Sequence, residues 1–149
     1  MSYQERNTLV AIFVNVSVMA GFAWLIWTRY GEGAFAEADG LAIWAQTVLW
    51  IIPASIVATI VVTIVFSIVF AIATREADAD TVVDERDRSI GIKGMRVTMV
   101  VASAGFIGAM VALAVGWPAF AAFNIILAGF ALGDLLGSAT RLVLYRGGI

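Results

Sequence analysis

The sequence predicts an all-α polytopic membrane protein with four transmembrane helices in two hairpins. Of its 149 residues, 62% are hydrophobic and 13% are charged, whereas a soluble domain carries about 25% charged residues. Its mean hydropathy is +0.97. Residues 41–73 carry no charge, and Asp134 is the only charged residue between Arg96 and Arg141. Runs this long and apolar are typical of helices that cross a bilayer.

We expect a single domain, residues 1–149, whose spans cover about residues 9–28, 45–73, 97–116 and 118–140. Each reaches the ~20 residues that a ~30 Å hydrocarbon core requires. The charge-free run at residues 41–73 is longer than one span needs, and Pro53 divides it. Residues 41–52 are therefore expected to lie partly in the outer interface before the helix enters the bilayer.

The distribution of basic residues predicts the topology. The basic residues expected on one side are Arg6, Arg75, Arg86, Arg88, Lys93, Arg96, Arg141 and Arg146. Only Arg29 falls on the other side. By the positive-inside rule, both termini and the 75–96 loop are cytoplasmic. The tryptophans fall near the opposite interface, as an aromatic belt would.

The composition argues against several classes of function. Cysteine and histidine are absent, which excludes disulfides, thiol chemistry and most zinc, copper and haem sites. The net charge is −2, so we expect no nucleic-acid binding. The sequence has no paired intramembrane carboxylates, no GxSxG motif and no P-loop. We therefore expect no enzyme, no cofactor, no metal and no catalytic residue.

Small residues at four-residue spacing predict close helix packing. The fourth span carries Gly129, Gly133 and Gly137. The third span carries a similar row, namely Ala104, Gly108, Ala112 and Gly116, and the second carries Ser55, Thr59, Thr63 and Ser67. Close backbone approach is what holds helices together in lipid. The rows can pack within one chain, or one glycine row can face a second copy in a homo-oligomer.

Asp134 is the anomalous residue of the fourth span. A carboxylate at the centre of a span costs ~2.5–3.5 kcal/mol on insertion scales, so it normally has a partner or a purpose. Depth counted from the Trp117 turn places it one helical turn above Arg96. The predicted intramembrane polar cluster is Asp134, Arg96, Asn15, Ser67, Thr98 and Ser138. Either Asp134 forms an ion pair with Arg96, or less favourably with Lys93 or Arg141, that fastens the hairpin, or it is a proton or ion site.

The cytoplasmic loop at residues 75–96 is the main polar segment. Thr81 and Asp84 have the spacing of a capping box that would start a short helix, and Gly91 and Gly94 would loosen that helix. Its alternating charges suit electrostatic docking of a protein partner. The candidate docking residues are Asp84, Glu85, Arg86, Asp87 and Arg88. The alternative is a solvated connector that only enforces topology.

The Asp84–Arg88 motif and the ending Leu142-Val-Leu-Tyr-Arg-Gly147 resemble those of a family of small four-helix bacterial membrane proteins described as domains of unknown function. Asp134 matches an acidic residue that the family has on its fourth helix, whereas Gly147 replaces its second terminal arginine. The resemblance covers roughly the second half of the chain. It implies the four-helix fold, a bacterial inner membrane and, from neighbouring helix-turn-helix regulators, a regulatory partner.

Small multidrug resistance transporters are similar only in size, because they use a glutamate in the first helix where this chain has Asn15 and Ser17. Our leading hypothesis is a non-enzymatic binding, regulatory or scaffold protein of the bacterial inner membrane. Its expected partners are the lipid bilayer, a second copy, and a soluble cytoplasmic or membrane protein. The competing hypothesis is a small proton- or ion-coupled transporter that uses Asp134.

Overall fold

The structure is a computed structural model that describes residues 3–36, 39–74 and 84–147. These residues form helices α1 (Tyr3–Gly31), α2 (Gly40–Leu49), α3 (Ile51–Thr74), α4 (Glu85–Ala114) and α5 (Ala119–Arg146), and the described part contains no strand. The stretches long and apolar enough to cross a membrane are Asn7–Gly31, Gly40–Val69, Glu85–Ala114 and Ala119–Arg146. The prediction of an all-α protein with four such helices is therefore confirmed.

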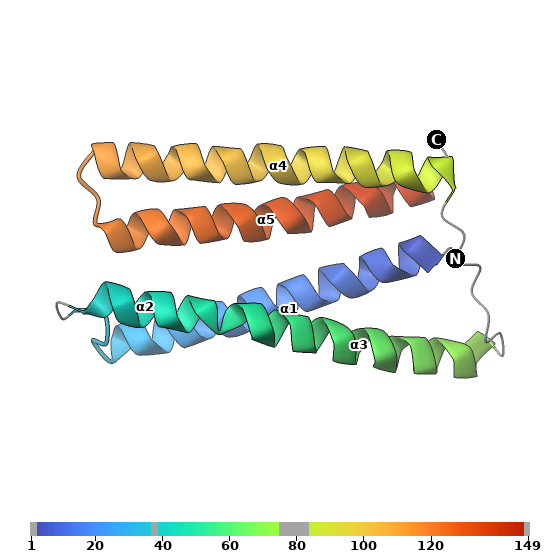
Figure 1. The fold of residues 1–149 in the computed structure, drawn as a ribbon, viewed down its shortest axis with the longest axis horizontal. Helices are drawn as coiled ribbons and strands as arrows, with labels where there is room; N and C mark the ends of the chain where they lie inside the picture. The colour runs from blue at the N-terminus through green and yellow to red at the C-terminus, as the bar shows by residue number, and fades with distance from the viewer. Residues whose placement is uncertain (1–2, 37–38, 75–83, 148–149) are drawn as a thin grey trace.

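The helices form a bundle in which α4 and α5 pack along most of their length (Figure 1). Helix α1 crosses between this pair and α3, contacting both α5 and α3. One end of the bundle gathers the start of α1, the end of α3, the start of α4 and the end of α5. The other end holds the end of α1, the start of α2 and the α4–α5 turn.

The predicted interruption by Pro53 is visible as the boundary between α2 and α3. Proline has no N–H, so the helical hydrogen bond to the carbonyl of Leu49 is lost, and its ring crowds that carbonyl. Helix α2 ends at Leu49 and α3 begins at Ile51. Trp50 between them keeps helical dihedrals, and its N–H donates to the Gln46 carbonyl at 3.4 Å. The two helices consequently continue one another as a single long apolar rod.

A tight turn joins α4 to α5. Gly116 adopts φ 85°, the left-handed conformation that glycine tolerates best. The N–H of Trp117 donates to the Ala112 carbonyl at 2.9 Å, which closes the end of α4. Pro118 is extended and directly precedes the first residue of α5. This geometry sends the chain straight back along α4.

The glycine row of α5 faces α4 of the same chain. Gly129, Gly133 and Gly137 are buried. A Cβ atom on Gly129 would lie 2.8 Å from the Cα of Gly105, and one on Gly133 would lie 2.8 Å from the Thr98 carbonyl oxygen. A Cβ atom on Gly137 would lie 2.7 Å from the carbonyl oxygen of Gly94. Backbone therefore meets backbone, the close approach that glycine permits in lipid.

The surface that α4 presents to α5 differs from the four-residue row expected from the sequence. Ala112 is buried and Gly108 lies against Ile125, but Ala104 is exposed. Each four-residue step turns about 40° around a helix of 3.6 residues per turn, so such a row leaves the interface after a few turns. The residues of α4 that meet the glycine row are Gly94, Thr98, Ala102 and Gly105.

Aromatic side chains pack together at the end of the bundle that holds the α4–α5 turn. The Phe120 ring at the start of α5 lies 5.2 Å from the Phe35 ring and 6.3 Å from the Trp44 ring, measured between centroids. The indole N–H of Trp44 donates to Oδ1 of Asn124 at 3.3 Å. Trp44 is thereby buried, whereas Trp117 in the turn is exposed. The cluster anchors α2 to α5.

Candidate functional site

Helix α4 begins well before the predicted third span. Asp84 is its N-cap, with an extended backbone and a side chain that accepts the Asp87 N–H at 2.7 Å. The Asp87 carboxylate in turn accepts the Asp84 N–H at 3.5 Å. The capping box is therefore Asp84–Asp87, and the expected Thr81 cap lies outside the described residues. The negative charges of Glu85 and Asp87 in the first turn also interact favourably with the positive end of the helix dipole.

Gly94 has no side chain, and this leaves space beside α4 for the side chain of Arg141 from α5. A Cβ atom at Gly94 would lie 2.5 Å from Cγ and 2.6 Å from Nε of Arg141. Gly94 is buried, so the glycine permits the long arginine side chain to cross α4 closely. The buried Nε of Arg141 has no hydrogen-bond acceptor among the described residues. The expected loosening at Gly91 and Gly94 is not seen, because both lie inside the regular helix α4.

Three of the five predicted docking residues make contacts with other residues of the same chain. Asp84 and Asp87 form the capping box. Nη2 of Arg86 donates to the backbone carbonyl of Tyr145 at 3.5 Å, and the Tyr145 hydroxyl interacts with the Asp87 carboxylate. These contacts fasten the start of α4 to the end of α5. Glu85 and Arg88 remain exposed.

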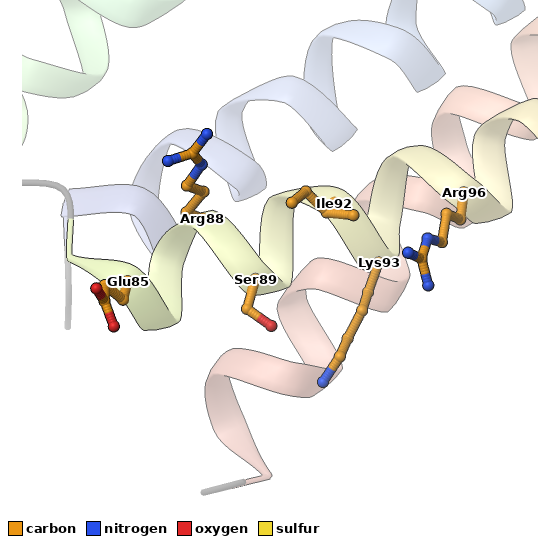
Figure 2. Close-up of a pocket in the computed structure, with 6 residues that line it drawn as sticks. All are labelled: Glu85, Arg88, Ser89, Ile92, Lys93 and Arg96. Carbon is orange, nitrogen blue, oxygen red and sulfur yellow. The ribbon is translucent and has the colours of Figure 1, made fainter.

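A shallow groove of about 380 Å³ lies along the outer side of α4 (Figure 2). We call its lining residues the basic face: Glu85, Arg88, Ser89, Ile92, Lys93 and Arg96. Their three- and four-residue spacing places them on one side of the helix. Ile90 and Gly94 are buried on the opposite side. This side is broad: Arg88 and Lys93 lie at its two edges, and in Figure 2 their side chains point away from each other.

The cations of the basic face have no counterion in the part of the chain that the structure describes. Within the described ranges, no carboxylate oxygen lies within 4.0 Å of Arg88, Lys93 or Arg96. The ion pair that the structure does show joins Nε of Arg146 on α5 to Oε1 of Glu5 on α1, at 3.0 Å. Three cations and Glu85 give the face a formal charge of +2. The face therefore carries an excess of positive charge, although the whole chain is net acidic.

Asp134 is bonded to α1 rather than to a basic residue. Nδ2 of Asn15 donates to Oδ2 of Asp134 at 2.9 Å, and both residues are half-buried. No ion pair joins Asp134 to Arg96, Lys93 or Arg141 in the part of the chain that the structure describes. Arg96 matches Asp134 in depth but lies on the side of α4 turned away from α5. Counting residues from the turn gives depth and does not give the angle around the helix.

The other members of the predicted polar cluster are dispersed. Thr98 lies between α4 and α5, and its hydroxyl donates to the Gly94 carbonyl at 3.3 Å. Ser138 is 2% exposed on α5. Ser67 lies on α3, which packs against α1. Asn15 and Asp134 are the pair that the fold brings together, and the buried Oδ1 of Asn15 has no hydrogen-bond donor among the described residues.

Ser89 and Ile92 were not among the residues singled out from the sequence, and Lys93 was considered only as a partner of Asp134 and as a basic residue of the cytoplasmic side. The three- and four-residue spacing from Glu85 to Arg96 could have identified them. This spacing places the residues on one helix face only if the helix extends beyond the membrane. The described residues contain no group of three Asp or Glu side chains that could hold a metal ion. No protein-family model, curated protein or solved structure matches this chain.

Proposed function

We propose that the chain is a non-enzymatic, multi-pass protein of a bacterial inner membrane that acts by binding an anionic ligand on the basic face of α4. In this proposal the spans form two hairpins, and both termini and the start of α4 are cytoplasmic. The positive-inside rule supports that orientation, because every basic residue that the structure describes, except Arg29, lies toward the end of the bundle where α4 begins.

One observation carries the proposal: three exposed cations lie on one broad side of an ordered helix and have no counterion among the described residues. Isolated surface charges are common, but here Arg88, Lys93 and Arg96 point from a rigid support. The capping box and the Arg86 contact with Tyr145 hold that support in place. Binding to a preorganised surface costs less conformational entropy than binding to a flexible loop.

Photo-crosslinking in native membranes tests the proposal. A photoreactive amino acid at Ser89 should give a specific adduct, with protein or lipid, because this position lies within the basic face. The adduct should be lost in the triple variant Arg88→Gln, Lys93→Gln, Arg96→Gln. It should persist in Arg29→Gln, a control that removes an exposed cation at the end of α1, outside the face. Absence of any adduct, or equal yield in the triple variant, would contradict the proposal.

The Asn15–Asp134 pair favours a second candidate function, a proton- or ion-coupled transporter. Ionisable residues within spans mark ion pathways in many membrane proteins. Asp134 is half-buried, and the buried Oδ1 of its partner Asn15 has no hydrogen-bond donor within the described ranges. If this function applies, Asp134→Asn should fold normally and abolish a pH-dependent flux in proteoliposomes. Flux that is equal in the wild type and the variant would exclude an essential role for Asp134.

A further inference from the structure

We infer that the basic face binds the phosphate group of an anionic phospholipid, whose acyl chains lie along the apolar continuation of the same side of α4. This inference rests on the proposed function, because it names the ligand of the face proposed there. The argument uses the depth of the cations, the surface below them and the sign of the charge.

The basic residues lie at the depth of lipid headgroups. Arg96 is the last charged residue before an uncharged run that extends to Asp134. Lys93 and Arg88 lie about 4.5 Å and about 12 Å farther along the helix, at 1.5 Å per residue. The headgroup layer on each side of the hydrocarbon core is about 5–7 Å thick. Lys93 and Arg96 consequently fall within this layer, and the long side chain of Arg88 can reach it.

The surface below Arg96 is exposed and, apart from Ser103, apolar. Continuing at the same helical spacing, Met99 is 65% exposed and Val100 is 69% exposed. Phe106 and Ile107 follow, at 53% and 62%. Ile92 extends the apolar surface upward into the groove. One side of α4 thus changes from cationic to apolar along its length, which matches a phospholipid with its headgroup at the start of the helix.

The charge of the face selects an anionic lipid. Arginine offers several N–H donors to phosphate oxygens, lysine adds a compact positive charge, and the Ser89 hydroxyl adds another donor. A zwitterionic headgroup such as phosphatidylethanolamine brings its own ammonium, which the excess of cations would repel. Phosphatidylglycerol carries no such cation. Juxtamembrane basic residues attract anionic lipids in this way.

Free phosphate shares the same chemistry, but the observations favour a lipid as its source. A soluble anion would use the cations and leave the adjoining apolar track without a role. An acidic protein segment would also find charge complementarity here. It would, however, have to bind at headgroup depth, where lipid phosphates are already concentrated. Because the cations adjoin the exposed apolar residues Met99 and Val100, we assign a phospholipid as the ligand.

Native mass spectrometry of the full chain in detergent tests this inference. Phosphatidylglycerol should bind more tightly than phosphatidylethanolamine. Each of Arg88→Gln, Lys93→Gln and Arg96→Gln should weaken phosphatidylglycerol binding about fivefold, and the triple variant about a hundredfold. Arg29→Gln, which removes an exposed cation outside the face, should leave the affinity unchanged. Because the substituted side chains are exposed, thermal melting should be unaffected, and the single variants remain informative if the triple variant proves unstable.

Three results would overturn the inference. The first is equal binding of the two lipids. The second is an unchanged affinity in all of the substituted variants. The third is binding of inorganic phosphate as tight as that of phosphatidylglycerol, which would identify a soluble anion as the ligand.

The Ser89 adduct separates this inference from the proposed function. A lipid adduct supports both, and a protein adduct without lipid overturns the inference while the proposed binding face stands. No adduct contradicts both.

Discussion

The glycine contacts between α4 and α5 predict a sharp response to the smallest substitution, Gly133→Ala. The new Cβ atom would lie 2.8 Å from the Thr98 carbonyl oxygen and 3.4 Å from the Ala102 nitrogen. Both contacts are with backbone, so no rotamer change can relieve them. To reach an ordinary separation of 3.4 Å, the helices must move apart by about 0.6 Å. Overpacking of a close interface typically costs about 1–3 kcal/mol.

The matched control is Gly91→Ala, on α4 itself. A Cβ atom there would meet nothing within 4 Å. Alanine should therefore be neutral or stabilise this helix, by up to about 1 kcal/mol through its higher helix propensity. The two variants add the same single methyl group. The difference between their free energies of unfolding consequently reports the helix contact and not the loss of glycine.

Reversible unfolding in mixed micelles, followed by circular dichroism, measures both free energies. We expect Gly133→Ala to be destabilised by about 1–3 kcal/mol relative to wild type. Stability of Gly133→Ala equal to that of Gly91→Ala would refute the close packing of α4 on α5. A change of oligomeric state without a loss of monomer stability would instead place the glycine row against a second copy.

Further predictions concern two pairs of residues. Asp84→Ala should lower the free energy of unfolding by about 1 kcal/mol, because it removes the N-cap of α4; the same value as wild type would contradict the capping box. Asn15→Leu and Asp134→Leu should show a coupling of about 0.6 kcal/mol, and at most about 1.7 kcal/mol, in a double-mutant cycle. Arg96→Gln should leave stability unchanged, whereas a loss equal to that of Asp134→Leu would restore the ion pair expected from the sequence.

Hydropathy and breaker residues were sufficient to predict the helices. Long uncharged runs identify spans because lipid cannot solvate charges or free backbone groups. Pro53 lacks an N–H, so a break in the helical hydrogen bonds just before it was also predictable, and the boundary between α2 and α3 falls there, at Trp50. The predicted third span begins after the start of α4 because hydropathy marks where the membrane begins. A helix before that span was expected from a capping box at Thr81 and Asp84, and the structure has the box at Asp84 and Asp87.

The candidate site was harder to predict because it depends on angles around helices. Asp134 and Arg96 match in depth, yet the structure turns Arg96 outward and gives Asp134 the amide of Asn15. That partner lies 119 residues away in the chain. The crossing of α1 and α5 therefore had to be known first. Likewise, three of the five expected docking residues form the capping box or contact Tyr145. These contacts could be recognised only once the packing of the start of α4 on the end of α5 was known.

The sidedness of the basic face tests the account most directly, because a ligand can be assigned to this face only if it is cytoplasmic. The sequence has no cysteine, so single variants Ser89→Cys and Glu32→Cys can be labelled cleanly with a membrane-impermeant maleimide. In intact cells the account predicts labelling of Glu32→Cys alone, and in inverted membrane vesicles labelling of Ser89→Cys alone. Labelling of Ser89→Cys from outside intact cells would contradict it.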